Sequence, residues 1–217
     1  MQSKANNNRQ RFNRAATCNM LIALLTLLFA NVALAGGDAD RGKDKSITCA
    51  ACHGADGNSI NPEWPSLAGQ HESYLVRSIQ SFKDGSRDNV LMSPQAAALS
   101  DQDIQDLAAY FAVQKPKRHT ADPALIAQGE RVYRGGNMGK GISACIACHG
   151  PNGRGNPGAS YPSLAGQHAT YTTAQLMAYR NNVRQSDTTL SQVMRNIAAE
   201  MSDDEIKAVS SYIQGLQ

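Results

Sequence analysis

The sequence Cys49-Ala50-Ala51-Cys52-His53 is repeated 96 residues later as Cys145-Ile146-Ala147-Cys148-His149. Two thiols three positions apart on one helical turn can reach the two vinyl groups of a porphyrin and form thioethers, and the adjacent imidazole can then bind the iron. The repeat predicts two covalently attached haem c groups. The predicted attachment residues are Cys49, Cys52, Cys145 and Cys148, and the predicted iron ligands are His53 and His149.

Three other uses of paired cysteines fit this pattern less well. In zinc sites the two Cys-x-x-Cys pairs usually lie about 15–20 residues apart, and a histidine need not follow directly. A thioredoxin-like pair would follow a strand and occur once. A disulfide inside each Cys-x-x-Cys, the default for an even number of cysteines in an oxidising compartment, gives no reason for the histidines. We therefore favour haem attachment over all three.

The repeat extends well beyond the cysteines and predicts two similar domains. The stretch from Trp64 to His71 returns as Tyr161 to His168, shifted by 97 residues. Four residues near the end of each half also correspond, namely Ile104, Leu107, Tyr110 and Phe111 with Ile206, Val209, Tyr212 and Ile213. A polar stretch closed by proline separates the copies. We predict an N-terminal domain at 36–115, a linker at 116–123 and a C-terminal domain at 124–217.

Both halves are predicted to be all-α. Residues at helical spacing occupy equivalent places in them: Leu75, Ile79 and Phe82 in the first, and Thr172, Leu176 and Tyr179 in the second. The last helix of each half should begin at a capping box, Ser100 with Asp103 and Ser202 with Glu205. No segment shows a sustained alternating pattern typical of strands. Glycine, proline and asparagine follow each Cys-His site, which predicts loops around a cofactor.

Residues 1–35 are predicted to be a cleaved signal peptide. Four basic residues precede an 11-residue apolar stretch from Met20 to Ala30, and Ala33-Leu34-Ala35 fits a cleavage site. That stretch is shorter than the roughly 18–20 residues of a membrane span, which argues against an uncleaved anchor. The whole sequence has 21 basic and 18 acidic residues, and removal of the signal peptide leaves 17 basic and 18 acidic residues. The remaining chain is near neutral and has no nucleic-acid footprint.

The second axial ligand of each iron must come from elsewhere in the chain. Met92 lies 12 residues before Ile104 and Met194 lies 12 before Ile206, so the repeat pairs these two methionines. The other sulfur candidates fit less well, because Met201 lies opposite the apolar Leu99, Met177 belongs to a helix pattern and Met138 has no partner. The equivalent pair His71 and His168 is the rival, but its place at a helix start favours a surface role. A methionine ligand would suit an electron carrier, because it raises the reduction potential.

The motifs in both halves, C-A-A-C-H-G-x-D-G-N with P-S-L-A-G-Q and C-I-A-C-H-G-P-N-G with P-S-L-A-G-Q-H, resemble the di-haem cytochrome c4 family across residues 36–217. The resemblance implies two tandem class I cytochrome c domains related by an internal pseudo-twofold. It implies that His53 pairs with Met92 and His149 with Met194. It also implies that the carbonyls of Pro65 and Pro162 hold the proximal imidazoles. Met92 is followed by Ser93-Pro94, a loop-like setting, whereas the segment around Met194 should be more helical.

The sequence therefore predicts a periplasmic one-electron carrier, either soluble or peripherally associated with the membrane, and not an enzyme. The resemblance implies a respiratory chain, with a quinol-cytochrome c oxidoreductase as donor and a terminal oxidase as acceptor. No small-molecule substrate or nucleic acid is expected. Two alternatives stay open: a di-haem peroxidase-type enzyme, which would need a displaceable axial position, and a fixed cytochrome subunit of a larger dehydrogenase.

Overall fold

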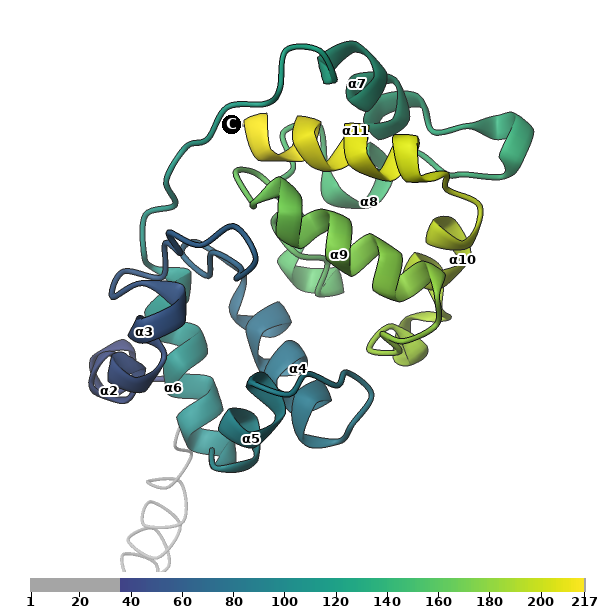
Figure 1. Ribbon diagram of the computed structural model, residues 1–217. Coiled ribbons are helices and arrows are strands. Elements are labelled where there is room, and N and C mark those ends of the chain that lie inside the picture. The colour runs from purple at the N-terminus through teal and green to yellow at the C-terminus, as the bar shows by residue number, and fades with distance from the viewer. Residues whose placement is uncertain (1–35, 217) are drawn as a thin grey trace, which may run out of the picture. The chain divides into compact units, whose positions relative to one another are not determined.

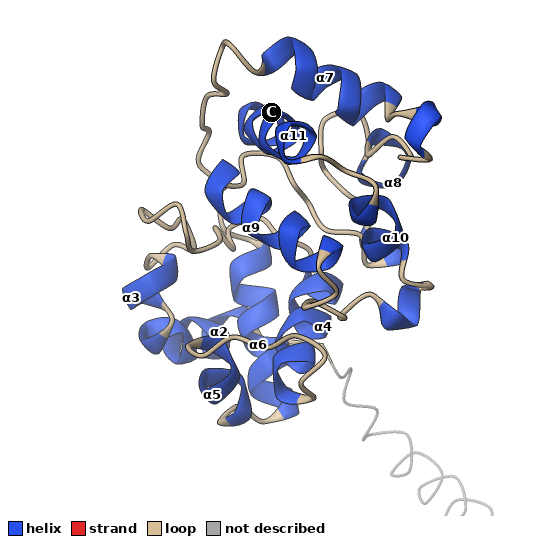
Figure 2. Cartoon of the chain, turned by 45° about the vertical axis from the view of Figure 1, so that its right-hand side comes forward, coloured by secondary structure: helices blue, strands red, loops and turns tan. Residues whose placement is uncertain are grey.

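The computed structural model describes residues 36–216, so the predicted signal peptide at 1–35 lies outside the described residues. Between residues 36 and 216 the chain forms helices and loops without a strand, as Figure 2 shows. Two isolated bridges, Asn137 with Ile142 and Asn156 with Tyr161, close tight loops. None of the helices in this part of the chain is both long and apolar enough to cross a membrane. The predicted all-α fold is confirmed.

The two halves contain the same succession of α-helices (Figure 1), and the second half has additional short 3-10 helices. In the first half these are α2 (Ala39–Lys45), η1 (Ser46–Thr48), α3 (Ala50–His53), α4 (Glu72–Lys83), α5 (Met92–Ala97) and α6 (Asp101–Ala112). In the second half they are α7 (Ile126–Gly135), η2 (Met138–Lys140), α8 (Ile146–His149), η3 (Pro157–Ala159), α9 (Ala169–Arg180), η4 (Thr188–Leu190), α10 (Val193–Ala199) and α11 (Asp203–Gly215).

Both predicted capping boxes begin the last helix of their half. The Ser100 hydroxyl accepts the backbone N–H of Asp103, and the Asp103 carboxylate accepts the backbone N–H of Ser100, at the start of α6. Ser202 and Glu205 make the same reciprocal pair at the start of α11. Each box satisfies two backbone N–H groups that have no partner within the helix. Helix α6 contributes Leu107, Ala108 and Phe111 to the apolar core of the first half, and α11 contributes Ile206, Val209 and Ile213 to that of the second half.

Each half has its own apolar core. In the first half it is formed by Leu75, Leu107, Ala108 and Phe111. In the second half it is formed by Val132, Tyr133, Ile142, Leu176, Met201, Ile206, Val209 and Ile213. A cysteine of the local Cys-x-x-Cys-His motif packs against each core, Cys49 in one and Cys145 in the other. The cores therefore lie directly beside the two motifs.

The first and last helices of each half cross at a glycine. In the first half, a Cβ at Gly42 of α2 would overlap the carbonyl oxygen of Asp106 in α6. In the second half, a Cβ at Gly129 of α7 would overlap the carbonyl oxygen of Ala208 in α11. A missing side chain lets the two backbones approach closely. Both crossings leave the opposite face of the last helix available to the core and the site.

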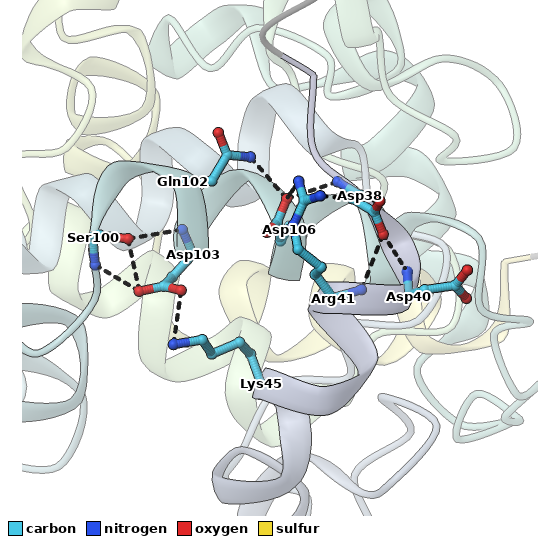
Figure 3. A network of polar contacts seen from close by, with 8 residues as sticks. All are labelled: Asp38, Asp40, Arg41, Lys45, Ser100, Gln102, Asp103 and Asp106. Atoms are coloured by element: carbon cyan, nitrogen blue, oxygen red, sulfur yellow. Dashed lines mark hydrogen bonds and ion pairs between the residues drawn. The ribbon is translucent and has the colours of Figure 1, made fainter.

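A buried carboxylate fastens α2 to α6, as Figure 3 shows. Asp106 is buried and accepts two hydrogen bonds from Arg41, at 2.8 and 3.0 Å, and one from the backbone N–H of Asp38 at 2.7 Å. The Arg41 hydrogen bond is the main cause that holds the pKa of Asp106 far below its usual range. Lys45 pairs with Asp103 at 2.9 Å beside it. The two-pronged contact fixes the position of α2, which leads into the first Cys-His motif.

The segment between the halves is held by hydrogen bonds to the first half at its beginning and to the second half farther along. Residues 116–122 contain no helix. The side chain of the buried Asn58 accepts the backbone N–H of Lys117 at 2.7 Å and donates to the carbonyl of Lys115 at 3.1 Å. Residues 36–217 form one compact unit, in which hydrogen bonds join the two halves.

Candidate haem sites

The predicted site residues of both halves line one continuous cavity of about 1020 Å³. This volume reaches the upper end of the roughly 300–1,000 Å³ typical of ligand pockets. Its lining includes all ten predicted residues: Cys49, Cys52, His53, Pro65, Met92, Cys145, Cys148, His149, Pro162 and Met194. Each half thus brings two thiols, one imidazole and one thioether to a mostly apolar wall. This donor set fits a covalently attached haem in each half.

Each motif histidine is fixed by a proline carbonyl. The Nδ1 atom of His53 donates to the carbonyl oxygen of Pro65 at 2.8 Å, and that of His149 donates to Pro162 at 3.0 Å. Because a carbonyl can only accept, this contact sets the tautomer and leaves Nε2 to bind a metal. Burial lowers the pKa of both histidines, against the opposing effect of the proline carbonyls. The lowered pKa favours the neutral imidazole, which is the form that ligates a metal.

The four cysteines of the described chain form no disulfide, and one pair lies at each site. Burial raises the pKa of Cys145 to about 11, and it also raises the pKa of Cys49. Reactive Cys-x-x-Cys pairs of redox enzymes have a thiol pKa below the ordinary value, because nearby groups stabilise the thiolate. The opposite shift at these two positions argues against a thioredoxin-like role.

Met92 and Met194 both lie at the beginning of a short helix. Met92 is the first residue of α5, where the Asn89 side chain accepts its backbone N–H at 3.0 Å. Pro94 then falls in the first helical turn, where a missing N–H costs nothing. The expectation of a loop-like setting for Met92 was therefore wrong, and both methionines have helical surroundings. Met194 is the second residue of α10 and packs against the core of its half.

Of the three methionines that the repeat did not pair, Met201 also lines the cavity, whereas Met138 and Met177 do not. Met201 is 4% exposed within the core of the second half, in keeping with its place opposite Leu99. Met177 lies in α9 and packs against the same core, while also lying outside the cavity lining. Met138 is 86% exposed. Of the five methionines within residues 36–216, Met92 and Met194 are the pair that the repeat makes equivalent, and both line the cavity.

The rival pair His71 and His168 does not line the cavity. Both residues directly precede helices, α4 and α9, as predicted. The expected surface role is wrong for His168, which is 5% exposed. Its Nε2 atom contacts the carbonyl of Ser59 in the other half at 2.9 Å, and that of His71 contacts the carbonyl of Arg154 at 2.6 Å. These histidines join the two halves instead of facing the cofactor space.

Two glutamines join the halves in the same reciprocal way. The carboxamide of Gln167 binds both backbone groups of Ser66, and that of Gln70 binds both backbone groups of Ser163, all at 2.9–3.0 Å. The glutamines belong to the repeated P-S-L-A-G-Q motif, but sequence reasoning assigned them no role. Their equal spacing from the motif serines was the available signal.

Two buried arginines, Arg87 and Arg184, were not predicted as site residues from the sequence. Arg87 and Arg184 line the cavity, and the 97-residue offset relates them to each other. Both donate to the side-chain oxygen of Gln175 at 2.8 Å. Among residues 36–216, no carboxylate lies within ion-pairing distance of either guanidinium. Buried charges are normally paired, so this arrangement suits carboxylates of a bound group.

The positive charge of this pair also acts on Tyr74, which accepts a hydrogen bond from Arg184 at 3.1 Å. Burial would raise the pKa of Tyr74, but Arg184 and Arg87 outweigh it and lower that pKa to about 8. Arg195, a residue next to Met194, has no comparable role. It pairs with the buried Asp187 at 2.7 Å, so its charge is already neutralised.

Comparison with known proteins gives the same picture. The profile of the cytochrome c family matches residues 39–113 and 126–217. Cytochrome c4 of Pseudomonas aeruginosa is 49% identical over 193 residues, which cover 89% of this chain and 96% of that protein. The structure of reduced recombinant cytochrome c4 from Pseudomonas stutzeri superposes with a TM-score of 0.81 at 47% identity, covering 84% of this chain and 100% of that chain. A thiosulfate dehydrogenase electron acceptor of Stutzerimonas stutzeri (strain A1501) is 40% identical over 171 residues, 77% of this chain and 78% of that protein.

Proposed function

The chain belongs to the di-haem cytochrome c4 family, and from this membership we propose that it carries single electrons within a periplasmic respiratory chain. The family establishes the coarser statement: this is an electron-transfer protein with two covalently bound haem c groups, and it is not an enzyme. The compartment, the donor, the acceptor and the role of each site residue belong to the proposal.

The observation that carries the proposal is the shared cavity, whose lining includes two thiols, one imidazole and one thioether from the proposed site of each half. In the first half, Cys49 and Cys52 would form the thioethers, while His53 and Met92 would bind the iron. In the second half, Cys145 and Cys148 would form the thioethers, while His149 and Met194 would bind the iron. Haem c supplies the redox chemistry, because its iron alternates between the ferric and ferrous states.

The surrounding residues serve electron transfer by holding the sites rigid. Pro65 and Pro162 orient the histidines and raise their basicity through the Nδ1 hydrogen bond. Arg87 and Arg184 would neutralise cofactor carboxylates where the halves meet. Two protein ligands at each iron would leave no open position for a substrate, in contrast to a peroxidase. An electron could enter at one half and leave at the other, because both sites open into one cavity.

We further propose that the signal peptide directs the chain to the periplasm and is cut after Ala35. By family resemblance the donor is a quinol-cytochrome c oxidoreductase and the acceptor is a terminal oxidase. The test is stopped-flow kinetics with the purified holoprotein and membranes that contain either complex. Reduction by the quinol-oxidising membranes and oxidation by the oxidase membranes, both inhibited by specific poisons of those complexes, would support the assignment. Transfer with neither membrane would contradict it.

A second candidate partner is a dehydrogenase, because one relative is named a thiosulfate dehydrogenase electron acceptor. The same stopped-flow assay can include a purified thiosulfate dehydrogenase with thiosulfate. Faster reduction by this enzyme than by the quinol-oxidising membranes would favour the dehydrogenase role. Co-elution of the two proteins on gel filtration would add that the cytochrome is a fixed subunit. Separate elution would favour a mobile carrier.

A further inference from the structure

The peptide group between Pro65 and Ser66 is hydrogen-bonded on both sides. Its carbonyl oxygen accepts from Nδ1 of His53 at 2.8 Å, and its N–H donates to the side-chain oxygen of Gln167, in the other half, at 3.0 Å. Each end of this peptide therefore serves a different half. It connects a proposed iron ligand of the first half with a glutamine of the second.

The second half repeats the arrangement. The carbonyl oxygen of Pro162 accepts from Nδ1 of His149 at 3.0 Å. The N–H of the same peptide, which belongs to Ser163, donates to the side-chain oxygen of Gln70 at 2.9 Å. The contacts are thus crossed: each histidine is linked through one peptide to a glutamine of the opposite half.

Further contacts fix the orientation of both carboxamides. The Nε2 atom of Gln167 donates to the carbonyl of Ser66 at 2.9 Å, and its side-chain oxygen also accepts the backbone N–H of His168 at 3.0 Å. Gln70 makes the same contacts with Ser163 and His71. Backbone N–H groups only donate and carbonyls only accept, so the oxygen of each carboxamide must face the serine N–H.

Hydrogen bonds in a chain polarise one another. A peptide whose N–H is bound by a glutamine oxygen has a more negative carbonyl oxygen, which pulls more strongly on the histidine Nδ1–H. That pull raises the basicity of the imidazole as an iron ligand. A more basic ligand stabilises the oxidised iron and lowers the reduction potential, which is one of the protein's means of tuning haem.

We propose that Gln167 tunes the reduction potential of the haem held by His53, and that Gln70 tunes that of the haem held by His149. Each half thereby lowers the potential of the cofactor in the other half. This proposal rests on the proposed function, because it takes both histidines as iron ligands. The glutamines are positioning residues that act through a peptide group. Docking of the two halves is then part of what sets the potentials.

The test is a redox titration of the holoprotein with Gln167→Leu and Gln70→Leu. Gln167→Leu should raise the potential of the haem at His53, and Gln70→Leu should raise that of the haem at His149. Combining either leucine variant with Met194→His should strongly lower the potential of the haem at His149. The two steps of the titration are then well separated, and each can be assigned to one haem. Gln167→Glu keeps an oxygen acceptor for the Ser66 N–H, so it should not raise the potential.

Gln214→Leu is the matched control. The Gln214 side chain accepts the backbone N–H of Ala169 at 2.9 Å and donates to the carbonyl of Thr120 at 2.8 Å. Like Gln167, it binds backbone groups, but it contacts neither the Pro65–Ser66 peptide nor the Pro162–Ser163 peptide. The potentials of this variant should equal those of the unchanged protein. If the leucine variants do not load haem, Gln167→Met offers a side chain of similar volume without an acceptor oxygen.

The crossed pattern makes the proposal easy to contradict. A shift at the haem of the glutamine's own half, an equal shift at both haems, or no shift would each overturn it. The NMR signal of the histidine Nδ1–H gives a second readout, which should move only in the opposite half. Failure of the proposed function is distinguishable, because the unchanged holoprotein would then lack the optical and EPR signature of histidine–methionine ligation. With that signature present and no crossed shift, only the tuning is wrong.

Discussion

Arg87 of the first half donates a hydrogen bond to the hydroxyl of Tyr171 in the second half at 2.6 Å. Arg184 of the second half likewise donates to the hydroxyl of Tyr74 in the first half at 3.1 Å. Each of these contacts connects the two halves, and the 97-residue offset relates one to the other. The same reciprocity governs the glutamines and the histidines beside them. The contacts where the halves meet therefore follow a pseudo-twofold arrangement.

The arginine pair predicts a shift in reduction potential. Replacing Arg184 or Arg87 with glutamine removes a positive charge from the cavity lining. Because reduction adds an electron, loss of a nearby positive charge disfavours the reduced state, and we expect a fall on the order of 50 mV. Redox titration measures it. Arg184→Lys keeps the positive charge, so its reduction potentials should stay close to those of the unchanged protein.

Arg134→Gln is the control for this prediction. Arg134 is an exposed residue of α7 that pairs with Glu130 at 2.9 Å, away from the cavity lining. Its replacement makes the same change in net charge and should leave both potentials unchanged. An equal fall in Arg134→Gln and Arg184→Gln would show that only net charge matters, and that the arginine pair has no special place.

The methionine assignment predicts a spectroscopic loss. Met92→Ala and Met194→Ala should each remove about half of the weak red absorption band that marks a sulfur–iron bond, because each variant loses one of two proposed ligands. Met201→Ala should keep the full band and instead lower the free energy of unfolding by about 2–5 kcal/mol, since Met201 is a core residue. An unchanged band in Met194→Ala would contradict the assignment.

The helix crossing in the second half predicts a sharp contrast within one helix. Gly129→Ala should destabilise the protein by about 1–3 kcal/mol or more, because its Cβ would overlap the backbone of α11. Gly135→Ala, at the end of the same helix α7, meets nothing within 4 Å and should be neutral or slightly stabilising. Thermal unfolding of the two holoproteins measures the difference. Equal stability would contradict the close crossing.

The ion pair between α2 and α6 predicts a dependence of stability on pH. Hydrogen bonds from Lys45 and then Ser100 lower the pKa of Asp103 to about 2, below the roughly 3.9 of an unfolded chain. The lowered pKa means that Asp103 stabilises the fold above about pH 4, and that this contribution is lost as the pH falls toward 2. Denaturant unfolding should therefore show a shallower acid dependence for Asp103→Asn.

Asp101→Asn is the matched control, because Asp101 is an exposed residue in the same helical turn. It should keep the acid dependence of the unchanged protein more closely than Asp103→Asn does. If the two variants lose stability in parallel as the pH falls, the Lys45–Asp103 contact contributes nothing to acid sensitivity.

Local patterns predicted most of the fold and the chemical core of the site. The Cys-x-x-Cys-His motif fixes two thiols and an imidazole within one turn, and the capping boxes begin α6 and α11 as expected. The repeat paired Met92 with Met194, and both line the cavity. These features depend on neighbours a few residues apart or on an internal copy, so the sequence alone reveals them.

Contacts between the halves could not be predicted in the same way. His168 lies at a helix start, a usually exposed place, but its partner Ser59 is 109 residues away and buries it. The pairing of Arg87 with Tyr171 spans 84 residues. A constant offset in residue number can show that two residues occupy equivalent positions in the two halves. It does not show that either residue contacts the opposite half. These contacts depend on how the two halves pack against each other, and the periodicity of the sequence does not predict this packing.

The measurement that tests the central claim most directly is a redox titration of the purified holoprotein, followed by optical absorption and EPR. Two one-electron steps from two low-spin haems, both with the signature of histidine–methionine ligation, are the predicted result. A high-spin haem would indicate an open axial position and would favour an enzyme. A haem with two histidine ligands would contradict the assignment of Met92 and Met194.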